Sequence, residues 1–593
     1  METIIGPLGF TIPVQTLASG TEIDFTPEKV SDWCQNLPIA DLGTVTKKLF
    51  HALSECNKVA LSPSDRFEIL ALMSPPLLLV CSSLKKHFIH QTKKLSKQQL
   101  IIANLAQTFH TEMNNGYKLV IEQSANDPSE ETKMRILPIA LQRFLYHASQ
   151  ILLQNYQLYV NAPETIWKEI HLSYQISENT QAQSNENFNT EYKRILLLTI
   201  SSPYHWNQME QTATYKASET WATVVTLQKE PTQNMETGVF FIDLALDKPP
   251  VLFSQTEKKL SETSLFLDVN PVLSRLQSLL NTLEPNELRA KLSHYHEPEY
   301  AVSVPILKGL MKTWQTIPAR LHKREKKSMT IHICIGLIAA HYYLNNKQLF
   351  KQPQSGEENA NTPLALPTLT VEEETDETEG TTDSSTNDEK RMLSEQESFG
   401  AYPVYQCALF DENPQGYGLL WPENVYPPIQ AGALIGILIT VDNESYWEAG
   451  RIRWLQHSTM NEFKLGVERL PGTIKAGAVQ LAGEGNGDIY LRGLLLESTL
   501  LVPTLPFKAG DRVIFIQENE SPIDLDLTEL VDSTGSYKQF SFNTKRSTAE
   551  KLAIQEAEER QKKINEAERK KKLEAEGEGE SEGDGFDSVW TQL

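Results

Sequence analysis

The 593-residue sequence has few cysteines, and their arrangement argues against two common kinds of site. There are five, an odd number, with wide spacing and no Cys-x-x-Cys pair: Cys34, Cys56, Cys81, Cys334 and Cys407. A disulfide framework or a zinc site needs closer and more regular spacing. The 13 histidines likewise lack metal-ligand spacing. The sequence therefore predicts reduced thiols, no metal site and a cytoplasmic protein.

Signals for a membrane are also sparse. The first ten residues, METIIGPLGF, contain no basic segment, so we expect no secretory signal. The longest apolar run extends from about residue 331 to 344 and contains His332 and His341. This run is shorter than the roughly 20 residues that a membrane helix needs. We expect it to form a core strand and helix, and we expect no insertion into a membrane.

Motifs for catalysis are lacking as well. The sequence contains no Gly-x-x-x-x-Gly-Lys-Ser/Thr, Gly-x-Ser-x-Gly or His-Glu-x-x-His motif. Its formal net charge of −22 disfavours binding to nucleic acid polymers, because such binding needs a basic surface. The sequence therefore favours a binding protein that is not an enzyme and needs no cofactor.

The chain is too long for one hydrophobic core, and its first half has helical periodicity. Residues 1–175 are expected to form an all-α bundle or solenoid. Ser62 and Pro63 mark the start of one helix, whereas Pro75-Pro76 and Asn114-Asn115-Gly116 are expected to break helices. A polar linker at about 175–190 leads to a mixed, mainly helical domain at 190–315.

The second half changes to a period of two residues, which is typical of strands. Short strands between about 406 and 470 predict a small β-barrel within residues 316–471. A segment at about 352–398 is rich in acidic residues and is expected to be a disordered insertion in this barrel. The segment PPIQAGALIGI is echoed by LPFKAGDRVIF, and each follows a Gly-Leu-Leu strand. We therefore expect a second barrel-like unit at 472–546, which would be a degenerate duplicate of the first.

The C-terminal residues are charged. A solvated helix is expected at 547–576, followed by a disordered acidic tail at 577–593. Four apolar residues near the end have the spacing of one helical face: Phe586, Val589, Trp590 and Leu593. They predict either a motif that binds a partner's apolar groove or a segment that folds back onto the protein.

Three short patterns follow one another around the first predicted barrel. Arg320 and Arg324 are four residues apart just before its first strand, and Asp411, Asn413 and Gly416 follow a later strand. The third pattern is Gly-Arg-Ile-Arg-Trp at 450–454 followed by Leu-Gly-Val at 465–467. Together they resemble the PilZ family, whose barrels bind cyclic di-GMP. The resemblance is atypical, since Asn413 replaces a serine, Arg469 replaces an apolar residue, and a long segment separates the first two patterns.

The resemblance implies a ligand site formed by five residues: Arg320, Arg324, Asp411, Asn413 and Gly416. An arginine can form two parallel hydrogen bonds with a phosphate or with guanine. A carboxylate such as that of Asp411 can accept from guanine N1–H and N2–H. The amide of Asn413 can stand in for a hydroxyl, and a glycine at 416 would allow a positive φ. Arg451 and Arg453 are expected on the solvent face of their strand, and the second barrel is expected to bind no nucleotide.

Two functions remain open. The first is a multidomain α+β regulatory protein that binds cyclic di-GMP and relays this signal to a protein partner. The second is an interaction scaffold whose barrel no longer binds nucleotide.

Overall fold

A computed structural model describes most of the chain. The described residues are 2–20, 23–89, 95–125, 129, 132–180, 186–230, 237–253, 260–283, 289–294, 297–315, 323–349, 401–421, 429–441, 444–459, 462–482, 490–518, 520–534 and 536–544. The expected acidic insertion at 352–398, the charged helix at 547–576 and the tail with Phe586 to Leu593 lie outside these residues.

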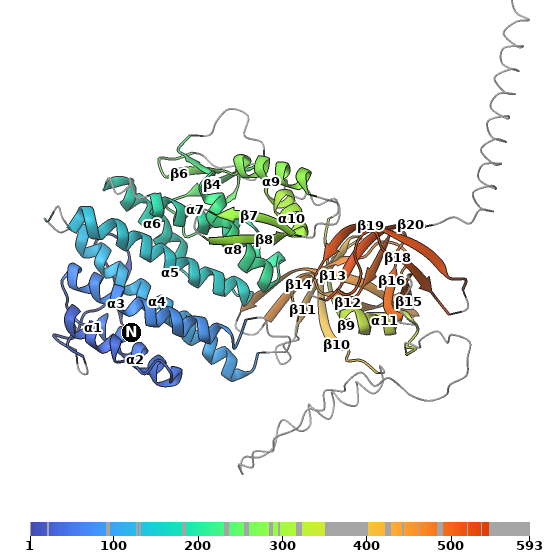
Figure 1. Cartoon of the computed structure of the whole chain (residues 1–593), viewed down its shortest axis with the longest axis horizontal. Helices are drawn as coiled ribbons and strands as arrows, with labels where there is room; N and C mark the ends of the chain where they lie inside the picture. Colours follow the sequence, from blue (N-terminus) through green and yellow to red (C-terminus); the bar gives the residue numbers. More distant parts are fainter. Residues whose placement is uncertain are drawn as a thin grey trace, which may run out of the picture.

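The N-terminal part is helical, as expected (Figure 1). A short hairpin of β1 (Thr3–Ile5) and β2 (Thr11–Pro13) precedes its helices. The helices are α1 (Pro27–Gln35), α2 (Leu42–Cys56), α3 (Pro63–Lys85), α4 (Lys97–Ala125), α5 (Leu137–Gln157), α6 (Ile166–Asn179), α7 (Glu186–Ile200) and α8 (Gln208–Ala222). Ser62 caps α3 by accepting a hydrogen bond from the Asp65 backbone N–H, which confirms the predicted helix start.

Two expected helix breaks are wrong. Helix α3 continues through Pro75 and Pro76, because its apolar face is buried on both sides of them, at Met73 and Leu77. Helix α4 continues through Gly116, where a Cβ atom would lie 2.8 Å from a methyl of Leu70. This glycine allows α4 to pack closely against α3, which outweighs its low helix propensity.

One described helix, α3, is long and apolar enough to cross a membrane. Its residues Ile69, Leu70, Met73, Leu77 and Val80 are buried in the core that the other helices share. Packing within the protein therefore accounts for its composition.

A four-stranded sheet follows the helices. Its strand order is β3-β6-β4-β5, formed by β3 (Thr226–Gln228), β4 (Val239–Asp243), β5 (Val251–Leu252) and β6 (Ser264–Asp268). Helix α9 (Asn270–Thr282), the hairpin of β7 (Arg289–His294) and β8 (Glu297–Ser303), and α10 (Val304–Gln315) come next. Residues from Phe10 to Trp314 belong to one hydrophobic core, so the segments expected as separate domains pack together.

The first barrel has six strands and closes on itself in the order β10-β11-β14-β13-β12-β9. The strands are β9 (Glu325–Ile335), β10 (Tyr405–Asn413), β11 (Gly416–Trp421), β12 (Leu434–Val441), β13 (Glu444–Thr459) and β14 (Glu462–Arg469). Helix α11 (Gly336–Leu344) follows β9, so the apolar run is a core strand and helix as expected. Tyr159, which follows α5, is buried in the core of this barrel and joins it to the helical part.

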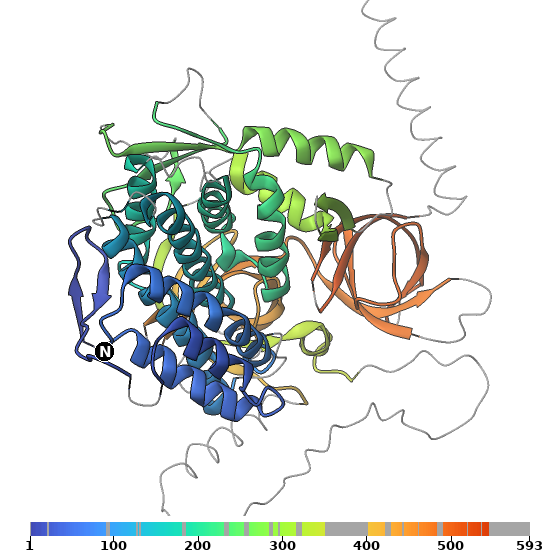
Figure 2. The ribbon, with the colours of Figure 1, turned by 60° about the vertical axis from the view of Figure 1, so that its left-hand side comes forward.

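The second barrel repeats this topology. Its strands are β15 (Lys475–Leu481), β16 (Tyr490–Leu495), β17 (Thr499–Val502), β18 (Arg512–Ile516), β19 (Ile523–Ser533) and β20 (Lys538–Thr544), and Figure 2 shows it nearly end-on as a ring. Their order, β15-β16-β17-β20-β19-β18, matches that of the first barrel strand for strand.

Of the two sequence similarities between the barrels, the Ala-Gly turn occupies equivalent positions and the Gly-Leu-Leu strand does not. Gly432 and Gly510 both have positive φ, at 85° and 91°, and both precede the fourth strand of their barrel. The Gly-Leu-Leu echo is not equivalent, since it lies on the third strand of one barrel, β11, and on the second strand of the other, β16. The turn before the fourth strand therefore carries the internal similarity.

Candidate functional site

A row of outward-facing residues crosses the wall of the first barrel. The strand register aligns Lys326 of β9 with Asp411, Asp411 with Gly418, Gly418 with Gly466, and Gly466 with Trp454 of β13. Leu419 and Leu465, which adjoin Gly418 and Gly466, are buried in the barrel core, as is Leu409, which a bulge in β10 separates from Asp411. Because side chains alternate along a strand, this row lies on the outer surface.

Asp411 and Arg324 form an ion pair at one end of the row. Arg324 Nη1 donates to both carboxylate oxygens of Asp411, at 2.8 Å to Oδ1 and 2.7 Å to Oδ2. The side chains are 31% and 16% exposed, so a ligand can reach both groups. Gly418 makes room for the carboxylate, since a Cβ atom there would lie 2.2 Å from Asp411 Oδ1.

Trp454 covers the neighbouring strand. A Cβ atom on Gly466 would lie 2.0 Å from Trp454 Nε1, so the indole rests directly on this glycine. Gly418 and Gly466 are paired on adjacent strands, so the Asp411 carboxylate and the indole lie over neighbouring strands of the wall. A planar base could stack on this indole while its edge meets the carboxylate.

Asn413 and Gly416 end the β10–β11 hairpin. Asn413 Oδ1 accepts a hydrogen bond of 3.0 Å from the Gln415 backbone N–H, which stabilises the turn. The expected positive φ at Gly416 is wrong. Instead, a Cβ atom there would lie 1.9 Å from the carbonyl oxygen of Val467, so the glycine is required for close pairing with β14.

The remaining arginines behave differently from one another. Arg320 lies outside the described residues. Arg451 is not on the solvent face as expected: it donates to Asp532 of the second barrel and, over 2.7 Å, to Oε2 of Glu468. Its side chain is only 19% exposed because it lies where the two barrels meet. Arg453 is 46% exposed, in agreement with the expectation.

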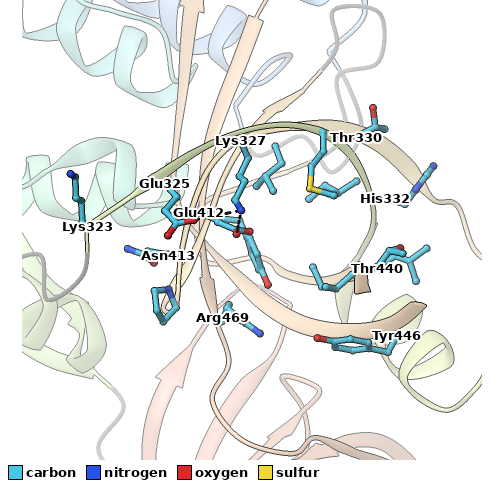
Figure 3. Close-up of a pocket in the computed structure, with 17 residues that line it drawn as sticks. Lys323, Glu325, Lys327, Thr330, His332, Glu412, Asn413, Thr440, Tyr446 and Arg469 are labelled. Carbon is cyan, nitrogen blue, oxygen red and sulfur yellow. Dashed lines mark ion pairs between the residues drawn. The ribbon is translucent and has the colours of Figure 1, made fainter. Parts of the chain in front are cut away.

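A cavity of about 610 Å³ opens at the end of the barrel, on the other side of β9 (Figure 3). Its rim includes Lys323, Lys327 and Arg469, and Lys327 forms a 3.0 Å ion pair with Glu412. The residues of β9 that precede His332 do not pair with β12, so the barrel wall is open between these two strands beside the cavity. Lys323, just before β9, and Lys327 of β9 line the cavity, whereas Arg324 contacts Asp411 on the outer wall.

The chemistry of the described residues points to ligand binding. They contain no group of three or more His, Cys, Asp or Glu side chains that could hold a metal ion. The row instead offers a guanidinium, a carboxylate and the half-buried indole of Trp454, which suit a purine nucleotide.

Three family models match consecutive parts of the chain. They describe the N-terminal domain of the cyclic-di-GMP receptor FimW at residues 28–232, its middle PilZ domain at 239–473, and the FimW C-terminal beta-barrel domain at 476–545. The chain is an atypical PilZ-domain protein. The curated relative "Cyclic-di-GMP receptor FimW" of Pseudomonas aeruginosa strain PAO1 is 25% identical over 587 residues, which cover 92% of this chain and 95% of the relative. No solved structure matches.

The PilZ resemblance drawn from the sequence is thereby confirmed, but the motifs missed part of the row. The short patterns assign no role to Trp454, and they indicate only strand positions for Gly418 and Gly466. Their importance depends on the strand register, which aligns them with Asp411. A Gly-rich pattern next to a tryptophan on a neighbouring strand would have been the available signal.

Proposed function

We propose that this PilZ-domain protein is a non-catalytic regulator that binds cyclic di-GMP on the outer wall of its first barrel. The observation that carries the proposal is the contact between Arg324 and Asp411, which are distant in sequence, beside the half-buried indole of Trp454. The name of the Pseudomonas aeruginosa relative supports the same ligand.

The ion pair suggests how the ligand enters. Asp411 exchanges the Arg324 guanidinium for the N1–H and N2–H groups of a guanine, and the guanine stacks on Trp454. Arg324 then turns to a phosphate or to the O6/N7 edge of a base. Opening a partly exposed ion pair costs about 1 kcal/mol or less, so the ligand contacts readily offset it.

Arg320, Asn413 and Gly416 complete the proposed site in different ways. Arg320 supplies a second guanidinium, whereas the Asn413 amide offers its N–H₂ group while its oxygen stabilises the hairpin. Gly416 keeps the hairpin close to β14. The site requires no metal and no cofactor.

Ligand binding is proposed to alter how a protein partner docks. Tyr159 anchors the helical part in the first barrel: its hydroxyl accepts a hydrogen bond of 3.4 Å from the Ala431 backbone N–H and donates to the Trp206 carbonyl over 2.9 Å. A change in the barrel wall therefore reaches the helices directly. We place the protein in the cytoplasm, without insertion into a membrane and without binding to nucleic acid polymers.

Calorimetry with purified full-length protein tests the proposal. We expect cyclic di-GMP to bind with a Kd in the micromolar range or tighter, about −8 kcal/mol or better. Arg324→Ala should weaken binding by roughly ten- to a hundred-fold, because a charge-assisted bidentate contact contributes about 1.5–3 kcal/mol. Arg512→Ala is the matched control, since Arg512 forms an exposed ion pair with Asp526 on the second barrel.

A scaffold without nucleotide binding is the alternative function. It is favoured by the engagement of the Asn413 side chain in its own hairpin and by the closed Arg324–Asp411 pair. Absence of measurable heat with wild-type protein would support the scaffold. Equal affinity of wild type and Arg324→Ala would remove Arg324 from the site.

A further inference from the structure

Arg453 is an exposed cation beside this row, with 46% of its side chain accessible to solvent. The pairing of β13 with β14 shifts between Ile452 and Trp454, so Arg453 occupies a β-bulge immediately before the indole. A bulge redirects the side chain of its extra residue. Arg453 contacts the outward-facing Glu468, which places its guanidinium on the same outer wall as Trp454.

The guanidinium of Arg453 is only weakly held. Its Nε lies 3.6 Å from Oε2 of Glu468, which is too long for a hydrogen bond. Glu468 is already satisfied by Arg451 at 2.7 Å. If Arg453 moves away, Glu468 therefore still has Arg451 as its partner. If Arg451 moved away, Asp532 and Glu468 would both lose a hydrogen bond.

The positions of Arg324 and Arg453 match the shape of the ligand. Arg324 lies next to Asp411 at one edge of the row, and Arg453 lies next to Trp454 at the other. Cyclic di-GMP carries two phosphates on opposite sides of its ring, so a ligand lying along the row presents one phosphate toward each edge.

We propose that Arg453 binds the second phosphate of cyclic di-GMP, opposite the side held by Arg324. The assignment rests on the proposed function and adds a residue outside the Arg-x-x-x-Arg pattern. A guanidinium suits this role because it can form two parallel hydrogen bonds with a phosphate.

The same residue faces the helical part of the protein. The 3-10 helix Pro203–His205 packs against β13, and Gln456 Nε2 donates to Asn161 Oδ1 over 2.8 Å. Desolvation, and secondly the positive charge of Arg453, lower the pKa of His205. Movement of Arg453 toward a phosphate therefore changes the electrostatic environment of a helical-domain residue.

The test compares Arg453→Ala and Arg453→Lys with wild type in calorimetric titrations with cyclic di-GMP. We expect about a tenfold weaker affinity for Arg453→Ala and a smaller loss for Arg453→Lys, which keeps the charge but not the fork geometry. Binding by wild type should weaken more steeply with added KCl than binding by Arg453→Ala, because one ionic contact is missing from the variant. Arg512→Ala serves as the control for loss of an exposed arginine.

The outcomes separate this inference from the proposed function. If wild type does not bind cyclic di-GMP, the proposed function fails and the inference fails with it. If wild type binds, Arg324→Ala weakens binding and Arg453→Ala matches Arg512→Ala, the inference alone is overturned. Equal melting temperatures of wild type and Arg453→Ala establish that a weaker affinity arises from the lost contact.

Discussion

Replacement of Arg451 by alanine is expected to lower the free energy of unfolding of the second barrel by about 3 kcal/mol. Arg451 holds two carboxylates, those of Glu468 on its own barrel and Asp532 on the other. Its removal leaves Asp532 without a cation at a site where that side chain is only 19% exposed. Breaking a buried ion pair by removing one partner is costly because the remaining charge is desolvated.

The loss is measured by urea denaturation with hydrogen exchange detected in β19 and β20, since a multidomain chain need not unfold in one step. Arg512→Ala removes a cation from an exposed pair on the same barrel and should cost less than about 1 kcal/mol. Arg451→Met combined with Asp532→Asn should cost less than the sum of the two single changes, because the pair is then removed together. Equal losses for Arg451→Ala and Arg512→Ala would show that Arg451 does not join the barrels.

Arg451 lies at a point where three parts of the chain meet. Glu210 caps α8 by accepting a hydrogen bond from the Asn207 backbone N–H, and its pKa is raised to about 7 by desolvation and by the charge of Asp532. Lys308 of α10 forms a 2.8 Å ion pair with Glu529 of β19. The second barrel therefore contacts both the helical part and the first barrel. Because Arg451 is only three residues from Trp454, a ligand on the outer wall would act close to this junction.

Period-two patterning was sufficient to locate the barrels. Each of the expected strands between residues 406 and 470 is present, because alternation of apolar and polar residues follows directly from a wall with one buried face. The internal duplication could also be seen in the sequence, since the Ala-Gly turn before the fourth strand needs a positive φ in both barrels. The fold class predicted from the sequence, a helical N-terminal region followed by a PilZ-like barrel and a second β unit, is confirmed.

Features that depend on packing between distant segments could not be predicted. Local rules at Pro75-Pro76 and Gly116 indicate breaks, but α3 and α4 bury enough surface there to remain continuous. Arg451 alternates with apolar residues like any solvent-facing residue, and only the position of the second barrel buries it. The two glycines of the row matter through strand register, which no short motif encodes.

Acidification is expected to destabilise the helical part strongly, through two histidines in its core. His110 of α4 and His147 of α5 are each 1% exposed, and their Nδ1 atoms are 3.0 Å apart. Burial and then the charge of Arg143 lower the pKa of His147 to about 3. Burial, His147 and Lys85 lower the pKa of His110 well below its ordinary value. Both imidazoles are therefore neutral in the folded protein, and one Nδ1–H donates to the other ring.

The sign of the effect follows from proton uptake. Unfolded histidine has a pKa of about 6.5, so below this pH the unfolded chain binds protons that the folded core rejects. The stabilisation that comes from keeping both histidines neutral is therefore fully present above pH 7. It is lost as the pH decreases toward 3. At pH 5 each histidine is about 1.5 units below its unfolded pKa, which corresponds to about 2 kcal/mol each and about 4 kcal/mol together.

The measurement is the free energy of opening of α4 and α5 at pH 7.5 and pH 5, obtained from hydrogen exchange in urea. Between pH 7.5 and pH 5, the free energy of opening should fall by about 4 kcal/mol less in the double variant His110→Gln, His147→Gln than in wild type, because glutamine does not titrate. This difference does not depend on how stable the variant is at pH 7.5. His51→Gln, at an exposed position of α2, should leave the pH dependence as in wild type. If the double variant retained the wild-type difference between the two pH values, the acid sensitivity would have to arise from other groups, and the neutral pair would carry no pH dependence.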